Sequence, residues 1–191
     1  MILIIFIFKI NLIYKKIISL FIQKHKYLKN HNIIMRILIT YYSRTKTTER
    51  VAKEIQKKLD CDIEEIIDLK NRSGALGWIK SLFNVFGGKQ AKIKPIEKDP
   101  SDYDLVIVGT PVWASTMSSA TLTYLTENKE KFKDISLFCT CGSSGYVETF
   151  AKMEEISDKK AVDTLYITKE EFKSSFESKI EDFDRKIKNI S

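Results

Sequence analysis

Six residues between a short apolar run and a segment with helical periodicity could bind an anion. Four carry hydroxyl groups and two carry positive charge: Ser43, Arg44, Thr45, Lys46, Thr47 and Thr48. Hydroxyls at the start of a helix donate hydrogen bonds beside free backbone amides and the positive end of the helix dipole. Capping the helix alone needs only one or two hydroxyls. The cluster therefore favours a phosphate site, although this loop has neither a P-loop frame nor a Gly-x-Gly-x-x-Gly turn.

Two further loops are suited to a flat aromatic ligand. The first follows an apolar run and comprises Thr110, Pro111, Val112, Trp113 and Ala114. An indole at the end of a strand can stack on a ligand ring, or it can simply close the hydrophobic core. The second loop follows a later apolar run and comprises Thr140, Cys141, Gly142, Gly145 and Tyr146. Its glycines permit a close approach of the backbone to a ligand.

Alternating strands and helices must position these loops. Short apolar runs predict buried strands at 36–41 and 104–109, and three further strands are predicted at 62–67, 135–140 and 161–167. Apolar periodicity predicts helices at about 49–59, 116–125, 146–156 and 172–190. This alternation predicts an α/β fold, a doubly wound five-stranded parallel sheet of order 2-1-3-4-5 with helices on both faces. Ligands of such sheets bind beyond the carboxyl ends of the first and third strands, where these loops would lie.

A further amphipathic helix is predicted at about 76–86, in the long segment between the second and third strands. It carries Trp78 among several other large apolar side chains. Such a helix packs on the sheet, or it provides a surface for a homodimer or another partner.

Composition excludes several kinds of site. Both histidines, His25 and His31, precede residue 35, so residues 35–191 cannot form a Ser-His or Cys-His catalytic pair or a zinc site with histidine ligands. Three cysteines are too few for a disulfide framework in a chain of 191 residues and indicate a reducing, cytoplasmic setting. Cys139 and Cys141 lack the Cys-x-x-Cys spacing of thiol oxidoreductases, which argues against a catalytic thiol.

The positive charge is concentrated at the N-terminus. The formal net charge is +7, but residues 1–34 hold six lysines and no acidic residue, which leaves 26 basic and 25 acidic residues, a net of about +1, for residues 35–191. We therefore predict no nucleic-acid partner.

Residues 1–34 form a basic, apolar leader that has three interpretations. It is a peripheral membrane segment, an extension that packs on the domain, or an untranslated stretch before a start at Met35. The third is favoured, and the mass of the natural N-terminus would test it.

From Met35 onward the chain resembles the flavodoxin family. The resemblance rests on MRILITYYSRTKTTERVA, YDLVIVGTPVWASTMSSATLTYL and FCTCGSSGY, which occur in the family's order. It implies that a loop of the form Ser/Thr-x-Thr-Gly-x-Thr surrounds the phosphate of FMN, with Ser43, Thr45 and Thr48 at the matching positions. Lys46 stands where the family usually has glycine, which implies an altered loop or weaker binding of FMN.

The resemblance also implies roles for the other two loops. Residues 110–114 would border one edge of the isoalloxazine, with Trp113 stacked on it. Residues 140–146 would lie on its other side, with Tyr146 as a second stacking residue.

Two functions follow from the resemblance. We expect an electron-transfer protein that uses noncovalently bound FMN to serve a redox partner protein or a small-molecule acceptor. The alternative is an NAD(P)H-dependent FMN or quinone reductase on the same fold. Carriers of this family are typically strongly acidic, so the near-neutral domain favours the reductase, whereas no separate nicotinamide-binding motif is present. A response-regulator receiver is disfavoured, because Gly109 and Thr110 stand where a receiver places an aspartate.

Overall fold

The computed structural model describes residues 35–69 and 90–190, and in this part of the chain five strands form one parallel sheet. The strands are β1 (Ile37–Tyr41), β2 (Asp62–Glu65), β3 (Leu105–Pro111), β4 (Asp134–Cys141) and β5 (Ala161–Thr168). Their order is β2-β1-β3-β4-β5, which confirms the predicted doubly wound α/β fold. The direction of winding changes between β1 and β3.

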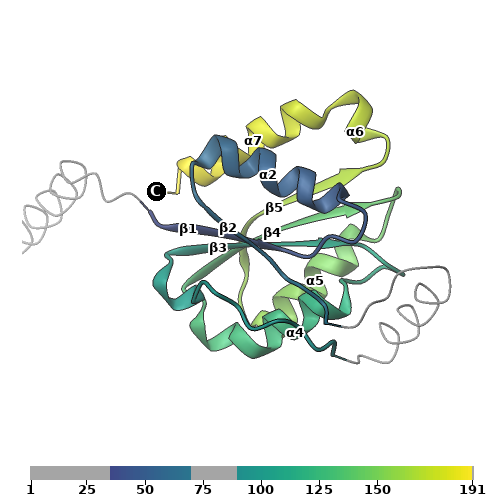
Figure 1. The fold of residues 1–191 in the computed structure, drawn as a ribbon. Helices are drawn as coiled ribbons and strands as arrows, with labels where there is room; N and C mark the ends of the chain where they lie inside the picture. The colour runs from purple at the N-terminus through teal and green to yellow at the C-terminus, as the bar shows by residue number, and fades with distance from the viewer. Residues whose placement is uncertain (1–34, 70–89, 191) are drawn as a thin grey trace, which may run out of the picture. The chain divides into compact units, whose positions relative to one another are not determined.

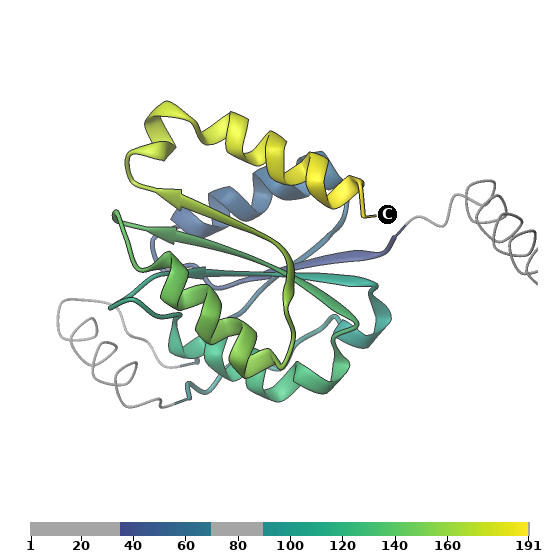
Figure 2. The ribbon, with the colours of Figure 1, turned by 180° about the vertical axis from the view of Figure 1, so that it is seen from behind.

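Helices cover both faces of the sheet, as Figures 1 and 2 show from opposite sides. The helices are α2 (Thr47–Leu59), α4 (Ser119–Asn128), α5 (Tyr146–Ser157), α6 (Glu171–Ser174) and α7 (Phe176–Lys188). One face carries α2 and α7, and the other carries α4 and α5. Two short 3-10 turns, Pro100–Asp102 and Lys129–Lys131, precede β3 and β4.

Each face of the sheet has its own apolar layer, and β3 contributes to both. Ile107 packs with the side chains of α2 and α7, while Val106 and Val108 pack with those of α4 and α5. Because both faces are buried, β1, apart from Thr40, and most of β3 are apolar throughout rather than alternating. Gly109 makes room for the ring of Phe138, since a Cβ atom at this position would lie 2.0 Å from its Cζ.

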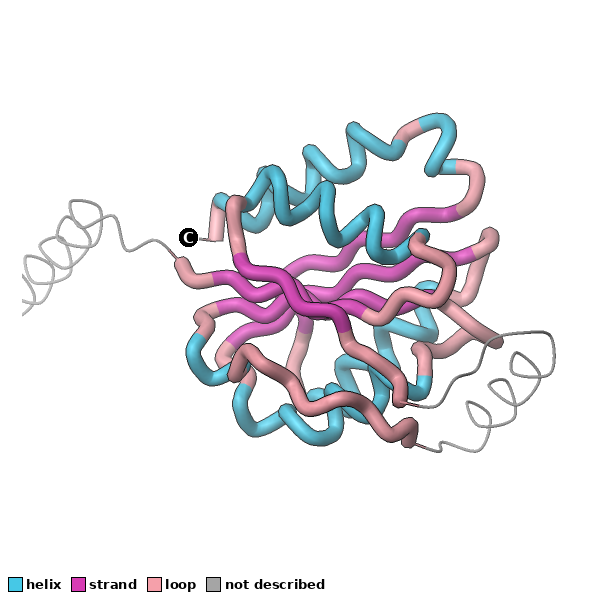
Figure 3. The backbone as a smooth tube through the Cα atoms, viewed as in Figure 1, coloured by secondary structure: helices cyan, strands magenta, loops and turns pink. Residues whose placement is uncertain are grey.

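Several elements differ from the predicted bounds (Figure 3). β2 ends at Glu65 rather than at residue 67, β3 and β4 extend through Pro111 and Cys141 into the predicted loops, and α2 begins at Thr47. The predicted start at residue 116 is wrong, because α4 begins at Ser119, where the Ser118 Oγ accepts a hydrogen bond from the Thr121 N–H at 3.1 Å. The predicted helix over 172–190 is two helices, separated at Ser175 by φ −143° and ψ 18°. The apolar spacing does not reveal this break, because Phe172 and Phe176 still face the same side and their rings stack at 5.0 Å. The helix predicted at about 76–86 lies outside the described residues.

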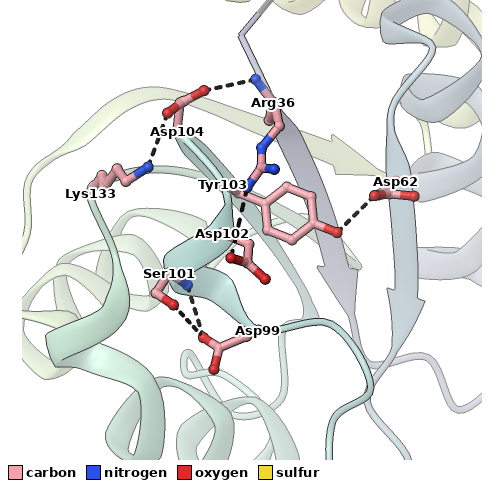
Figure 4. Close-up of polar contacts among 8 residues, drawn as sticks. All are labelled: Arg36, Asp62, Asp99, Ser101, Asp102, Tyr103, Asp104 and Lys133. Atoms are coloured by element: carbon pink, nitrogen blue, oxygen red, sulfur yellow. Dashed lines mark hydrogen bonds and ion pairs between the residues drawn. The ribbon is translucent and has the colours of Figure 1, made fainter.

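A polar network holds the amino ends of the strands together (Figure 4). The Asp104 carboxylate accepts the Arg36 N–H at 3.0 Å and pairs with Lys133 Nζ at 3.1 Å. The Tyr103 hydroxyl donates to Asp62 at 2.7 Å, which joins the start of β3 to β2. These contacts lie at the end of the sheet opposite to the loops that could carry chemistry, so their role is to support the fold.

Candidate functional site

The three loops singled out in the sequence meet at the carboxyl edge of the sheet. The Tyr42 N–H donates to the Gly109 carbonyl at 3.1 Å, which joins the first loop to the end of β3. The Val112 N–H donates to the Thr140 carbonyl at 2.8 Å, which joins the second loop to the end of β4. The structure therefore brings together residues that are almost a hundred positions apart in the chain.

The first loop ends in a lysine with left-handed backbone. Lys46 is the N-cap residue of α2, with φ 66° and ψ 1°, and no side chain caps the helix. This conformation normally favours glycine. The lysine thus keeps the backbone geometry that glycine would supply, and its Nζ forms an ion pair with Glu49 at 2.7 Å. Hydrogen bonds from Lys46 and Lys53 lower the pKa of Glu49, which favours its carboxylate form.

One hydroxyl of the first loop is buried without a partner. The Ser43 Oγ has no hydrogen-bond acceptor or donor within the described ranges, although the residue is only 9% exposed. The other hydroxyls of the cluster are hydrogen-bonded. The Oγ1 atoms of Thr45 and Thr47 lie 3.2 Å apart, and the Oγ1 atoms of Thr48 and Thr140 lie 2.9 Å apart. A buried hydroxyl left unpaired costs free energy. Together with the uncapped helix start, it fits a bound phosphate group, which would accept its hydrogen bond.

The second loop is closed by Thr110 and by a two-residue turn. The buried Thr110 Oγ1 accepts the Ser118 N–H at 3.0 Å and donates to the Pro111 carbonyl at 3.1 Å. Trp113 and Thr116 exchange two backbone hydrogen bonds, of 2.9 and 3.1 Å, around Ala114 and Ser115. Both turn residues have positive φ, 49° and 57°. Residues other than glycine, asparagine or aspartate rarely adopt this conformation in succession, so the turn stores backbone strain in the loop.

Trp113 lies where the first and second loops meet. Tyr42 contacts the indole edge-on, with ring centroids 5.9 Å apart at an angle of 88°. The guanidinium of Arg44 lies over the indole, 5.9 Å from its centroid. The indole remains partly exposed. It therefore joins the candidate phosphate loop to the second loop, and its stacking on a ligand ring stays a prediction.

The third loop lies against the second at Gly145, which is buried and has φ +86°. The residues before it, Gly142 to Ser144, are exposed, and Cys141 is half-buried. Tyr146, predicted as part of this loop, is the first residue of α5, and its ring stacks on Tyr166 of β5 with centroids 3.8 Å apart at 4°. Sequence reasoning missed Tyr166, because it belongs to none of the three loops and acts through contacts with distant residues. Ser115 lies within the motif that carries the resemblance, but its positive φ and its contact with Gly145 are visible only in the structure.

The cysteines of the described chain are free thiols, and none forms a disulfide. Burial raises the pKa of Cys141, and it does the same for the fully buried Cys139. Both therefore favour the protonated form, which is a poor nucleophile.

Over residues 35–69 and 90–190, no three His, Cys, Asp or Glu side chains are grouped so that they could hold a metal ion. No helix over the same residues is long and apolar enough to cross a membrane.

Comparison with solved structures shows the same fold in several proteins. The FMN complex of a flavoprotein from Lactobacillus acidophilus is 20% identical, with a TM-score of 0.60, and the match covers 72% of this chain and 96% of that one. A protein from Bacteroides uniformis is 20% identical, with a TM-score of 0.67 and coverages of 79% and 98%. Oxidised flavodoxin 2 from Bacillus cereus is 14% identical, with a TM-score of 0.51 and coverages of 82% and 99%.

No curated protein sequence matches the chain. A family model does, however: the one described as flavodoxin matches residues 36–177, which is most of the sequence and includes all three loops. The chain therefore belongs to the flavodoxin family.

Proposed function

We propose that this protein is an electron-transfer flavoprotein that binds FMN noncovalently at the carboxyl edge of its sheet. The observation that carries the proposal is the buried Ser43 hydroxyl, which has no partner in the described chain and lies just before the uncapped start of α2. Support also comes from the FMN complex of the Lactobacillus acidophilus flavoprotein, which has the same fold.

The residues divide into two groups by what they would hold. The first loop would bind the phosphate through its backbone amides and hydroxyls, and we assign this role to Ser43, Arg44, Thr45, Lys46, Thr47 and Thr48. The second and third loops would enclose the ring system, with Trp113 as the stacking residue and Tyr146 as a second stacking residue on the other side. Bound FMN would supply the redox chemistry, and the protein would set its orientation and exclude water.

The electron acceptor is a redox partner protein or a small molecule. A second candidate function, NAD(P)H-dependent reduction of FMN or a quinone, is favoured by the charge of about +1 over residues 35–191. A surface without strong negative charge lacks the electrostatic steering by which acidic carriers meet basic partners. The two functions differ in whether a nicotinamide cofactor reduces the flavin directly.

The first experiment is a visible spectrum of the purified full chain, before and after addition of FMN. A bound flavin spectrum is expected, and a protein that neither carries nor binds FMN would overturn both functions. Anaerobic addition of NADPH or NADH then separates them. Reduction only by dithionite or by a reductase supports the carrier, whereas prompt bleaching by a nicotinamide cofactor supports the enzyme.

A matched pair of serine variants tests the phosphate site itself. Ser43→Ala should weaken FMN binding roughly tenfold, the scale of one hydrogen bond to a charged group, while the apoprotein is as stable as before or more so. Ser136 provides the control, because its Oγ is also buried without a partner but lies in the middle of β4. Ser136→Ala should leave the affinity for FMN unchanged. Equal affinities of the Ser43→Ala variant and the natural protein would contradict the assignment.

A further inference from the structure

A stack of charged and aromatic groups links α7 to the third loop. Lys179 Nζ lies 3.4 Å from the centroid of the Tyr166 ring. The Tyr146 ring lies 3.8 Å from the same centroid and is almost parallel to it, at 4°. The ammonium and Tyr146 must occupy opposite faces of Tyr166, because a group 3.4 Å above the face that Tyr146 covers would overlap its ring. The order of the stack is therefore ammonium, Tyr166, Tyr146.

Glu171 forms an ion pair with the ammonium and attaches it to the end of β5. Lys179 Nζ lies 2.7 Å from Glu171 Oε1, and Glu171 Oε2 accepts the Thr168 N–H at 2.9 Å. The two side chains are only 24% and 23% exposed, so water and salt screen this pair less than they screen a surface pair. Burial opposes ionisation of Glu171, yet the hydrogen bonds from Lys179 and Thr168 outweigh it and keep its pKa below the usual range.

This arrangement reaches from one face of the sheet to the other. Ile180 and Phe183 pack α7 into the layer with α2, whereas Tyr166 packs against the layer with α4 and α5. Figure 1 shows these helices on opposite sides of the sheet. The Lys179 side chain passes the outer strand of the sheet order, β5, to reach the Tyr166 ring.

The stack ends at the loop that borders the candidate cofactor site. Tyr146 follows Gly145 directly, and Gly145 packs against Ser115 of the second loop. A second contact also ties the third loop to β5, because the N–H of Lys169, the residue after β5, donates to the Gly142 carbonyl at 3.2 Å. The third loop is therefore attached at both of its ends to β5 and the residues that follow it.

We propose that Lys179 and Tyr166 are positioning residues that hold Tyr146 and the third loop in the conformation that receives FMN. The inference rests on the proposed function, because it concerns the same site. A cation on one face of an aromatic ring and a parallel ring on the other restrict the orientation of Tyr146. A restricted loop loses less conformational entropy when a ligand binds, and this raises affinity.

Three variants test the inference. Lys179→Met removes the charge and keeps an unbranched chain, Lys179→Arg restores a cation above the ring, and Tyr166→Leu removes the middle of the stack. Lys160→Met is the matched control. Lys160 Nζ forms an ion pair with Glu154 at 2.6 Å, and the Glu154 carboxylate accepts the Ala161 N–H at 2.9 Å. Glu171 accepts the Thr168 N–H in the same way. The pair between Lys160 and Glu154 thus reproduces the ion pair and the backbone contact at the other end of β5.

The first readout is hydrogen exchange of residues 142–147 in the apoprotein, which requires no flavin. Lys179→Met and Tyr166→Leu should each speed exchange of this segment severalfold, while Lys179→Arg and Lys160→Met should leave it at the natural rate. The second readout is the affinity for FMN, which should fall about three- to tenfold in the first two variants only.

The outcomes separate the inference from the proposed function. If the natural protein does not bind FMN, the proposed function fails, and faster exchange in the apoprotein would still establish the control of the loop by Lys179. If the natural protein binds FMN and the Lys179→Met and Tyr166→Leu variants match it in both exchange and affinity, the inference is overturned. A loss of affinity that Lys160→Met shows equally would also overturn it, because the effect would then come from charge alone.

Discussion

Gly145 packs directly against Ser115, so that a Cβ atom on Gly145 would lie 2.9 Å from the Ser115 Cα. Its φ of +86° places it in the left-handed region as well. The contact brings the third loop onto the strained turn of the second loop, where Ser115 itself has positive φ. The distance between the second and third loops, which border the candidate flavin site, therefore depends on a position that has no side chain.

Gly145→Ala should lower the free energy of unfolding by about 2 kcal/mol, because the methyl group meets backbone and the left-handed conformation is unfavourable for alanine. Gly142→Ala is the control, since a Cβ atom there meets nothing within 4 Å. It should change stability by less than about 0.5 kcal/mol. Chemical denaturation of both apoproteins checks this, and equal losses would contradict the steric explanation.

Lys46 offers a test of backbone strain in the phosphate loop. Lys46→Gly and Lys46→Ala both remove the ion pair with Glu49, but only glycine adopts φ 66° without strain. The glycine variant should therefore be about 1 kcal/mol more stable than the alanine variant. At most positions in a helix the order is reversed. Urea denaturation compares the free energies of unfolding of the two variants. A more stable alanine variant would show that the backbone of Lys46 is not strained.

Trp113→Ala should weaken FMN binding by roughly 1–3 kcal/mol, the scale of lost aromatic stacking. Trp113→Phe keeps a flat ring and should recover most of the affinity. Fluorescence titration of FMN with each apoprotein measures the difference. Unchanged affinity of the alanine variant would refute the stacking role of Trp113.

The buried hydroxyl pair between Thr48 and Thr140 should behave as a coupled unit. Thr48→Val or Thr140→Val alone leaves the other hydroxyl without its partner and should cost about 1–2 kcal/mol of stability in the apoprotein. The double variant should cost less than the sum of the two, by about 1 kcal/mol. Strict additivity in a double-mutant cycle would show that the 2.9 Å contact contributes nothing.

Asp104 should make stability depend on pH. The hydrogen bond from the Arg36 N–H, aided by Lys133, lowers the pKa of Asp104 in the folded protein. A lowered pKa means that the carboxylate stabilises the fold above the unfolded value of about 4, and that this stabilisation is lost as the pH falls below it. Asp104→Asn should cost about 1 kcal/mol at pH 7, since the side chain is partly exposed, and the difference from the natural protein should fade toward pH 3.

The comparison variant for this prediction is Asp102→Asn. The Asp102 carboxylate lies 3.9 Å from Arg36 and both side chains are well exposed. This variant should track the natural protein at every pH. A difference that persists for Asp104→Asn at pH 3 would assign its effect to lost packing rather than to the carboxylate.

Sequence alone predicted five strands, their order and the edge of the sheet at which the three loops lie. Buried parallel strands are apolar on both faces, so runs such as Leu105–Val108 are visible without any tertiary information. A hydroxyl cluster, a Trp and a glycine-containing loop directly after three such runs must then lie at one edge, because the carboxyl ends of parallel strands coincide. The bounds of α4 and the break at Ser175 were missed, since both depend on local hydrogen bonds that apolar periodicity does not record.

Only the tertiary structure decided how the site is held. It shows that Lys46 keeps left-handed backbone, that Ser43 is buried without a partner, and that Tyr146 stacks on Tyr166 beneath Lys179. Each of these features depends on burial, on backbone angles or on contacts between residues far apart in the chain. Such contacts follow no repeating pattern, so residue spacing cannot predict them. The location of the site is therefore a property of the sequence pattern, while its geometry is a property of the folded chain.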